Sequence, residues 1–452
     1  MNIIVAGGGK VGLTLLRQLA AEGHNLTLID WDSRKLQAAT EQYDVIAVTG
    51  NCASGEVLLQ AGVRNAELLI AMTNADEVNL LCCMTAHGLN KNLHTIARIR
   101  NPEYSEQIMT MKDVFPLSMT VNPERRAAVE IERLLKYPGF LHRDTFAKGS
   151  AEIVELRVDS GSKLCNISLS EMNSIVKCKV LVCAVLRAGN AVAPGGNFVL
   201  REGDRIFVTA PTANLTLLLK NLGVITRRVR RVLICGGGRV SFYLAGLLEK
   251  DKMSVQVIDR DYDRCNELAS LLPQTSVVWG DCSSQSVLDS QGVDDCDALA
   301  ALTGVDETNM VIALYANARK VPQVITKLSR GQNSSIADSL PLGSVICPKE
   351  LCCNDIVRYV RAMQNQSGAA ISVHSIADGQ VEAVEFLVDE ATKNCGVPLR
   401  QLKLKPNVLV ASITHGVQTQ VPGGDSVLSQ GDTVVVVTSG RGVLHQLNDI
   451  FA

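Results

Sequence analysis

The strongest constraint on the fold is that the chain contains one long unit twice. Each copy occupies about half of the 452 residues. Four pairs of matching segments establish the duplication: GGGKVG (7–12) with GGGRVS (236–241), LIDWD (28–32) with VIDRD (257–261), AMTNADEVN (71–79) with ALTGVDETN (301–309), and APGGNFVLREGD (193–204) with VPGGDSVLSQGD (421–432). Because a long internal repeat indicates two copies of one structural unit, both halves should have the same fold.

The first part of each unit alternates between strands and helices. In the first half a short apolar strand enters the glycine-rich turn, a helix with apolar positions at helical spacing follows over 10–23, and NLTLID (25–30) is a second strand. Three further apolar segments, DVIAVTG, LLIAMT and HTIARI, continue the alternation. This order predicts a parallel sheet with helices on both faces and a ligand crevice at the carboxyl ends of the strands.

The second part of each unit is smaller, rich in alternating β-branched residues, and ends in a predicted short helix. The expected fold class is therefore α/β, with two Rossmann-like doubly wound parallel-sheet domains, each followed by a small α+β domain. The predicted domains are 1–121, 147–223, 229–346 and 369–452, with linking helices over 122–146 and 347–368. Each linking helix begins at a proline, which suits a first helical turn, and its apolar face serves either core packing or a contact between subunits.

Composition excludes several classes of protein. Hydrophobic residues make up 46% and charged residues 20% of the chain, as in folded proteins, and a net charge of -2 gives no electrostatic basis for binding nucleic acid. The longest apolar runs are too short to cross a bilayer. The 14 cysteines are scattered without a C-x-x-C pair, so neither a disulfide framework nor a metal site is expected. No leader precedes the first strand, so we expect a cytoplasmic protein.

The turn GGGKVG has the chemistry of a dinucleotide-binding loop. Gly7 permits the tight turn, Gly9 lets the backbone approach a phosphate, and Gly12 lets the helix pack close to the strand. The helix that begins here directs backbone N–H groups and its positive dipole end toward the phosphates. Asp30 ends the second strand at the offset of a ribose-binding carboxylate, which would repel a 2′-phosphate. The first half therefore predicts a site for NAD(H) or an adenine nucleotide rather than for NADP.

The second half keeps Gly236, Gly238 and Asp259 at the same spacing, but Ser241 replaces the third glycine. The serine side chain should push the helix slightly away from the strand. We therefore expect a second nucleotide site that binds more weakly or prefers another nucleotide. Four acids in the repeated segment are expected to lie exposed on helix faces, with ion binding as the minor alternative: Asp76, Glu77, Asp306 and Glu307.

The tandem glycine modules, the strand-end acids, the segments GNC and GDC, the two T-x-x-D-E-x-N segments and the small β-rich followers together resemble the TrkA family. Its members are peripheral cytoplasmic subunits of bacterial Trk potassium-uptake systems, built from two RCK (regulator of potassium conductance) units. The resemblance covers nearly the full chain and implies an RCK N-terminal and an RCK C-terminal domain in each half.

The resemblance also carries the family's nucleotide contacts onto both halves. In the first half these are Gly7, Gly8, Gly9, Lys10 and Val11 for the phosphates with Gly12 behind them, Asp30 for the ribose, Asn51 and Cys52 near the adenine, Thr73 and Asn74 near the phosphate loop, and Arg98 for the phosphates. The counterparts are Gly236, Gly237, Gly238, Arg239, Val240, Asp259, Asp281, Cys282, Thr303 and Lys327. Lysine in place of arginine loses the bidentate fork, and Gly304 loses the amide of Asn74.

Two functions compete for these sites. A NAD-dependent oxidoreductase would need a general acid or base and a substrate anchor beside the nicotinamide, and no such set stands out, so no catalytic residue is assigned. The resemblance implies instead a non-enzymatic regulatory subunit at the inner face of the cell membrane, assembled as a homo-oligomer, a dimer or tetramer that forms a ring. Its implied partner is a membrane-embedded potassium transporter subunit of the TrkH or TrkG kind, which it gates when NAD(H), ATP or ADP shifts its conformation.

Overall fold

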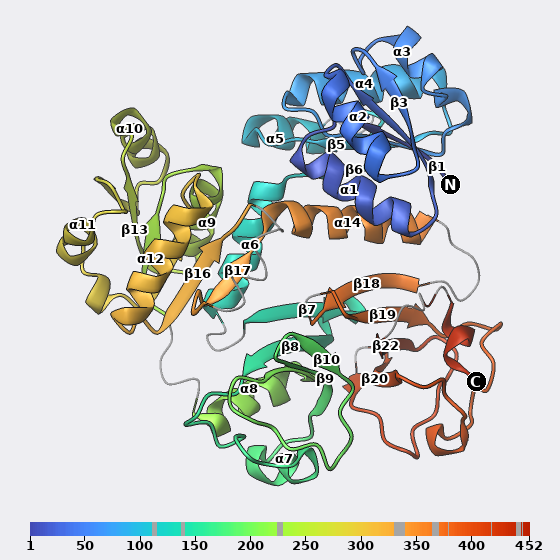
Figure 1. Ribbon diagram of the computed structural model, residues 1–452, viewed down its shortest axis with the longest axis vertical. Coiled ribbons are helices and arrows are strands. Elements are labelled where there is room, and N and C mark those ends of the chain that lie inside the picture. The colour runs from blue at the N-terminus through green and yellow to red at the C-terminus, as the bar shows by residue number, and fades with distance from the viewer. Residues whose placement is uncertain are drawn as a thin grey trace.

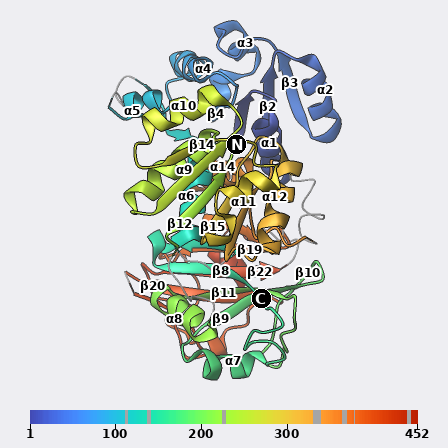
Figure 2. The same cartoon turned by 90° about the vertical axis from the view of Figure 1, so that its left-hand side faces the viewer.

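A computed structural model describes residues 1–110, 115–136, 141–223, 229–329, 340–363, 370–377, 379–416, 418–439, 444 and 446–452. These residues form two sheets of six parallel strands and two sheets of five antiparallel strands. The two parallel sheets with their helices lie at one end of the molecule, and the two antiparallel sheets lie at the other (Figures 1 and 2). The predicted α/β fold class, with two Rossmann-like sheets and two smaller domains, is confirmed.

The first parallel sheet has the strand order β3-β2-β1-β4-β5-β6. Its strands are β1 (Asn2–Ala6), β2 (Asn25–Asp30), β3 (Val45–Thr49), β4 (Leu68–Ala71), β5 (His94–Arg98) and β6 (Met119–Val121). Its helices are α1 (Lys10–Ala21), α2 (Ser33–Gln42), α3 (Gly55–Gln60), α4 (Asp76–Leu89) and α5 (Pro102–Thr110). Strand β1 is buried on both faces, since Ile3 and Val5 pack beneath α1 while Ile4 and Ala6 pack beneath α4. The strand order reverses between β1 and β4, and this reversal places the ligand crevice there.

The second parallel sheet repeats this arrangement in the order β14-β13-β12-β15-β16-β17. Its strands are β12 (Arg231–Cys235), β13 (Ser254–Asp259), β14 (Ser276–Trp279), β15 (Ala298–Ala301), β16 (Gln323–Lys327) and β17 (Ser344–Ile346). Its helices are α9 (Arg239–Lys250), α10 (Tyr262–Leu271), α11 (Gln285–Ser290) and α12 (Asp306–Ala318). The two halves therefore place their glycine-rich turns at equivalent points, each between the first strand of its sheet and the following helix.

The two antiparallel sheets pack against each other through one apolar cluster that includes Phe146, Phe207, Ala383 and Val435. The first contains β7 (His142–Phe146), β8 (Ala151–Arg157), β9 (Leu181–Arg187), β10 (Asn190–Val192) and β11 (Arg205–Pro211), with helices α7 (Leu169–Val176) and α8 (Thr212–Leu222). The second contains β18 (Ala370–Ile376), β19 (Val381–Leu387), β20 (Val408–His415), β21 (Gln418–Gln420) and β22 (Thr433–Ser439). The first sheet is followed by the predicted helix, α8. In the second, the predicted terminal helix is a short 3-10 turn, Leu447–Ile450, while residues 440–443 and 445 lie outside the described residues.

The linking helices are α6 (Pro123–Lys136) and α14 (Pro348–Met363). The prediction of a helix over 122–146 is too long, because His142–Phe146 forms the edge strand β7 and pairs with β8. For the helix predicted over 347–368, residues 364–368 lie outside the described residues.

Each linking helix packs on the opposite half of the chain. Ala127, Ile131 and Leu135 of α6 join the core of the second parallel sheet beside α9, and Ile356 and Val360 of α14 join the core of the first parallel sheet beside α1. Figure 1 shows this exchange, with α14 lying along α1 and α6 lying beside the sheet of α9. The apolar faces that could serve either core packing or a subunit contact thus serve core packing within the chain.

Ion pairs fasten both linking helices at equivalent points. Lys136 in the last turn of α6 lies 2.9 Å from the carboxylate of Asp251, which caps the C-terminus of α9. Arg361 near the end of α14 lies 2.6 Å from the carboxylate of Glu22, which caps the C-terminus of α1. Each linking helix therefore packs along the glycine-turn helix of the other half and is ion-paired to the C-terminal end of that helix.

Within the described part of the chain, none of the helices combines the length and the apolar character that a transmembrane span requires.

Candidate functional site

The glycine turns are shaped partly by the fold itself. Gly7 has φ +110°, and a Cβ there would lie 2.9 Å from the carbonyl carbon of Met72. A Cβ on Gly12 would lie 2.0 Å from the carbonyl oxygen of Gly7. Both positions need glycine because the turn lies against the backbone that follows β4, and helix α1 packs close to the turn and to strand β1. Gly236 repeats the first case with φ +101° and a Cβ position 2.9 Å from the backbone of Thr303.

Gly9 and Gly238 are different, because nothing in the protein excludes a side chain at either position. No heavy atom lies within 4 Å of a Cβ built on either residue, and their φ angles of -77° and -68° suit any amino acid. Each is the N-cap of its helix, where backbone N–H groups lack partners within the helix. These two residues leave the open cradle over a helix N-terminus that a pyrophosphate requires, so the residues present fit a nucleotide. Lys10 and Arg239 flank the cradles as exposed cations, while Val11 and Val240 are buried beneath them.

Asp30 is held in place against the turn. Its Oδ2 accepts a hydrogen bond from the backbone N–H of Gly8 at 2.6 Å, and its Oδ1 accepts one from the N–H of Asp32 at 2.8 Å. Lys35 adds an ammonium group 3.6 Å from Oδ1. Asp259 repeats this arrangement with the N–H groups of Gly237 and Asp261. Both acids thus end their strands beside the glycine turn with fixed carboxylates, as a ribose-binding role requires.

The residues expected near the adenine follow strands β3 and β14. Cys52 and Cys282 are buried, and the Cys282 thiol donates to the carbonyl of Ile258 at 3.3 Å. Asn51 and Asp281 are exposed, and each accepts a hydrogen bond from the backbone two residues on, at 3.1 Å and 2.8 Å. Their outer edges are therefore free to face a ligand, while the cysteines form the floor behind them.

Both tryptophans of the chain lie at this end of the sites. Trp31 directly follows Asp30, and Trp279 pairs in register with Asp259 on the neighbouring strand. The two side chains are 82% and 65% exposed. The sequence prediction did not include them. Trp31 stands next to its ribose acid in the sequence, whereas Trp279 reaches Asp259 only through the pairing of β13 with β14.

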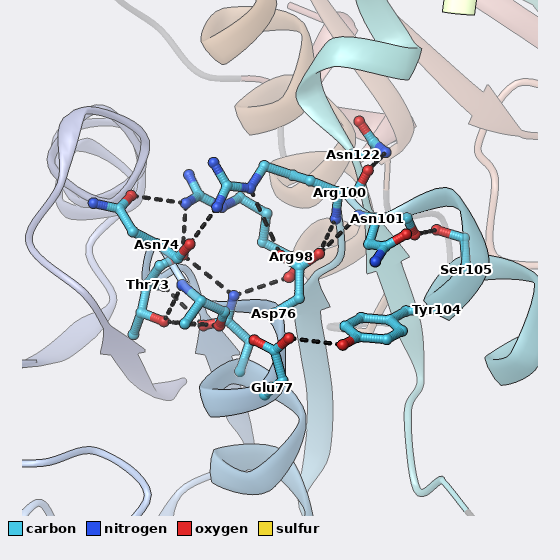
Figure 3. Close-up of polar contacts among 12 residues, drawn as sticks. Thr73, Asn74, Asp76, Glu77, Arg98, Arg100, Asn101, Tyr104, Ser105 and Asn122 are labelled. Carbon is cyan, nitrogen blue, oxygen red and sulfur yellow. Dashed lines mark hydrogen bonds and ion pairs between the residues drawn. The ribbon is translucent and has the colours of Figure 1, made fainter. Parts of the chain in front are cut away.

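Asn79 organises the phosphate side of the first site. Its Oδ1 accepts from the backbone N–H of Thr73 at 2.8 Å and from the Thr73 hydroxyl at 2.7 Å, and its amide donates to the carbonyl of Arg98 at 2.9 Å. The Arg98 guanidinium donates to the carbonyl of Thr73 at 2.5 Å and to Oδ1 of Asn74 at 3.0 Å. Figure 3 shows these predicted residues converging from the ends of β4 and β5. Asn79 is the last residue of the T-x-x-D-E-x-N segment, but its role in joining the two strand ends was not predicted, because that role appears only when the ends meet.

Asp76 is buried, so the expectation of an exposed acid at this position is wrong. Its Oδ2 accepts from the backbone N–H groups of Arg100 and Asn101 at 2.7 Å and 2.8 Å, and the guanidinium of Arg100 lies 3.6 Å from Oδ1 (Figure 3). The carboxylate therefore fixes the loop that follows β5. Burial lowers the pKa of Arg98, and the like charge of Arg100 adds to the shift. Two guanidinium groups side by side make this a strongly cationic arm, and such an arm attracts phosphate.

The second half repeats the scaffold with weaker cationic chemistry. Asn309 accepts from the N–H and hydroxyl of Thr303 at 2.8 Å and 2.7 Å and donates to the carbonyl of Lys327 at 2.9 Å. Asp306 is buried against the N–H of Ser329 at 2.9 Å, so the expectation of exposure is wrong here too. The Lys327 ammonium makes a 3.0 Å bond to the carbonyl of Leu302, and burial lowers its pKa. Glu77 and Glu307 are exposed, as expected.

Ser241 is fully buried, and its hydroxyl donates to the carbonyl of Gly236. In the first half, a side chain at the equivalent Gly12 would overlap the corresponding carbonyl, that of Gly7. The second turn therefore accommodates a side chain at a position where the first turn has no room for one. Among the described residues, no three or more potential metal ligands cluster together.

Two protein-domain families match this chain, each of them twice. The TrkA-N domain matches residues 3–115 and 232–348, and the TrkA-C domain matches residues 153–223 and 383–452. The Trk system potassium uptake protein TrkA of Vibrio alginolyticus is 29% identical over 457 residues, which cover 100% of this chain and 98% of that protein. The protein of the same name from Haemophilus influenzae is 28% identical over 460 residues, with 100% and 98% covered.

Solved structures share the fold at lower identity. The GsuK RCK domain is 17% identical with a TM-score of 0.61, covering 97% of this chain and 92% of that chain. The GsuK channel bound to NAD is 18% identical with a TM-score of 0.60, covering 97% and 77%. The human SLO3 gating ring is 13% identical with a TM-score of 0.50, covering 97% and 99%.

Proposed function

Because this chain belongs to the TrkA family, whose N-terminal and C-terminal domains it contains twice in tandem, we propose that it is the non-enzymatic regulatory subunit of a potassium-uptake system. It binds NAD(H) or an adenine nucleotide and gates a membrane-embedded potassium transporter subunit of the TrkH or TrkG kind. The observation that supports nucleotide binding is the open cradle at Gly9 and Gly238, two positions where the fold itself does not require glycine. A relative in structure, the GsuK channel, has been solved with NAD bound.

The first site is the principal NAD(H) site. Its tight turn directs the N-terminus of α1 toward the pyrophosphate, Asp30 receives the ribose, and the cationic arm of Arg98 and Arg100 meets the phosphates. The bound nucleotide supplies negative charge and binding free energy. The second site offers Lys327 in place of Arg98 and Ser241 in place of Gly12, so it binds more weakly or takes a different nucleotide.

The exchanged linking helices provide a route from nucleotide to conformation. The first site lies at the start of α1, and α1 packs against α14, which leads into the second antiparallel sheet. The second site lies at the start of α9, and α9 packs against α6, which leads into the first antiparallel sheet. A nucleotide that favours one position of a glycine-turn helix therefore shifts the small domain of the opposite half.

Assembly into a homo-oligomer is supported by exposed apolar residues on equivalent helices. Leu81 and Met84 of α4 are 53% and 40% exposed, and Val311 of α12, the counterpart of Leu81, is 58% exposed. Leu81 and Met84 also line an apolar groove with Ile108 and Phe115. The apolar groove on α4, with an exposed valine at the equivalent position of α12, fits self-association into a dimer or tetramer that forms a ring at the inner face of the cell membrane.

The proposal is tested by binding and turnover assays on one preparation. NADH, NAD, ATP and ADP are titrated separately by calorimetry, and NADH oxidation is followed with candidate carbonyl substrates. Saturable binding without oxidation supports a regulatory subunit, whereas sustained turnover would establish the oxidoreductase instead. The comparison variant is Gly9→Asp, whose Cβ meets no heavy atom within 4 Å and whose carboxylate repels phosphate, so binding at the first site should disappear while the fold persists.

The transport role is tested in cells that depend on this protein for potassium uptake. Deletion should reduce potassium uptake, the unmodified gene should restore it, and Gly9→Asp should change its dependence on cellular nucleotide. If Gly9→Asp restores potassium uptake with an unaltered response to nucleotide, uptake does not depend on nucleotide at the first site, and nucleotide gating there is refuted.

A further inference from the structure

Tyr243 connects the helix of the second site to the loop of the first site. It lies in the second turn of α9, the helix that begins at the second glycine cradle. Its hydroxyl donates to the carbonyl of Arg100 at 2.8 Å and accepts from the amide of Asn122 at 3.1 Å. Burial raises the pKa of Tyr243 above its ordinary value of 10.0, so the hydroxyl keeps its proton and remains a donor.

The Arg100 end of this contact leads directly into the phosphate arm of the first site. The N–H of Arg100 is bound to Asp76, and its guanidinium donates to the carbonyl of Asn74 (Figure 3). Asn74 also accepts from Arg98, the predicted phosphate ligand. A displacement of the Arg100 backbone should therefore move the cationic groups of the first site, because single hydrogen bonds connect them.

The Asn122 end leads into a linking helix. The Oδ1 atom of Asn122 accepts from the N–H of Arg125 at 2.9 Å, so this residue caps the start of α6. The Asn122 amide, which donates to Tyr243, also reaches the carbonyl of Arg100 at 3.4 Å. Tyr243, Asn122 and Arg100 thus form one polar junction among the second glycine-turn helix, the first linking helix and the first phosphate arm.

The duplication supplies an internal comparison. Thr14 occupies the position of Tyr243 in α1, and its hydroxyl donates to Lys10 within the same helix at 2.8 Å. Ser329 occupies the position of Arg100 in the second half. Tyr243 and Arg100 thus have no counterpart of the same type in the other half, so the contact that joins the two sites is asymmetric.

We propose that Tyr243 is a positioning residue whose hydroxyl couples the two nucleotide sites, so that occupancy of the second site changes the affinity of the first site for nucleotide. Nucleotide at the second cradle biases the position of α9, and Tyr243 passes that bias to Arg100 and the phosphate arm. The coupling is reciprocal, because a binding free energy shared by two sites acts on both equally. This inference rests on the proposed binding of nucleotide at both sites.

The test is a double-mutant cycle that reads the first site alone. All proteins carry Trp279→Phe, which leaves Trp31 as the one tryptophan of the chain, beside the first ribose acid. Quenching of its fluorescence by NADH reports the affinity of the first site. Gly238→Asp blocks the second cradle without steric conflict in the empty protein, and Tyr243→Phe removes the hydroxyl while keeping the ring. Tyr315→Phe removes a hydroxyl that donates to Asp289 at an exposed position and serves as the matched control.

With Tyr243 present, and with the second site filled by the nucleotide that calorimetry shows it to bind, Gly238→Asp should change the first-site dissociation constant by about three- to tenfold, the range expected when one neutral hydrogen bond carries the coupling. With Tyr243→Phe this change should fall below about twofold, and with Tyr315→Phe it should persist. An equal effect of Gly238→Asp in both Tyr243 backgrounds, or no effect in either, would overturn the inference while leaving nucleotide binding intact. Absence of NADH binding at both sites of the unmodified chain would instead overturn the proposed function and this inference together.

Discussion

Replacement of Gly9 by alanine should separate binding from folding at the first site. No heavy atom lies within 4 Å of the new Cβ, and the φ of -77° is ordinary for alanine. Alanine restricts the unfolded chain, which favours folding by about 0.4–1 kcal/mol, but it is a poorer N-cap than glycine by a similar amount. The free energy of unfolding should therefore change by less than about 0.5 kcal/mol.

Nucleotide affinity should respond much more strongly. The methyl group occupies the space through which a phosphate approaches the helix N-terminus, and overpacking of one methyl typically costs about 1–3 kcal/mol. That cost corresponds to a dissociation constant raised by roughly 5- to 150-fold. Calorimetric titration with NADH measures this change, and urea unfolding measures the stability of the same preparation.

Gly12→Ala is the matched comparison, because it adds the same methyl group three residues away. Its Cβ would lie 2.0 Å from the carbonyl oxygen of Gly7, whereas ordinary contact begins at 3.4 Å, so helix and turn must separate by the difference, about 1.4 Å. We expect a loss of about 1–3 kcal/mol in the free energy of unfolding. If Gly9→Ala binds NADH as tightly as the unmodified chain, or destabilises the fold as much as Gly12→Ala does, the assignment of Gly9 to the phosphate is refuted.

Three further changes test other parts of the site and its support. Asp30→Ala removes the predicted ribose acceptor and should raise the first-site dissociation constant for NADH by about 10- to 100-fold, since hydrogen bonds to charged groups contribute about 1.5–3 kcal/mol; an unchanged calorimetric affinity would show the ribose assignment to be wrong. Asn79→Ala leaves the N–H of Thr73 and the carbonyl of Arg98 without a side-chain partner and should cost about 2–4 kcal/mol of unfolding free energy in urea, whereas the exposed Glu77→Ala control should stay within about 0.5 kcal/mol. Burial alone would raise the pKa of Glu22, but His24 and Arg361 outweigh it and hold the pKa below its ordinary value of 4.5. The unmodified chain should therefore have a higher urea midpoint than Arg361→Met. This difference should be full at pH 7 and shrink as the pH falls below 4.5. A difference that grows in acid would contradict the stabilising role of this ion pair.

The sequence by itself determined the features that short segments encode. The glycine turns, the strand-end acids Asp30 and Asp259, and the alternation of strands and helices follow from local backbone chemistry and from the periodicity of apolar residues. The duplication strengthened each of these predictions, because the same pattern occurs twice at the same spacing. For these reasons the fold class and the region of each candidate site could be predicted before any contact was known.

The exchange of the linking helices could not be predicted in this way. The apolar face of α6 would suit its own half or the opposite half equally well by pattern, since burial of apolar area has no direction. Only the packing of α6 on α9 and of α14 on α1 decides between the two.

Tertiary structure also decided the roles of Asp76, Asn79 and Tyr243. An acid at the start of a helix is ordinarily exposed, where it interacts favourably with the helix dipole. Here the strand end at Arg98 and Arg100 brings backbone N–H and carbonyl groups to Asp76 and Asn79, and α9 brings Tyr243 to the same loop. These partners lie 19 to 143 residues apart in the chain, so the contacts follow from how the sheets and helices assemble and from no local pattern.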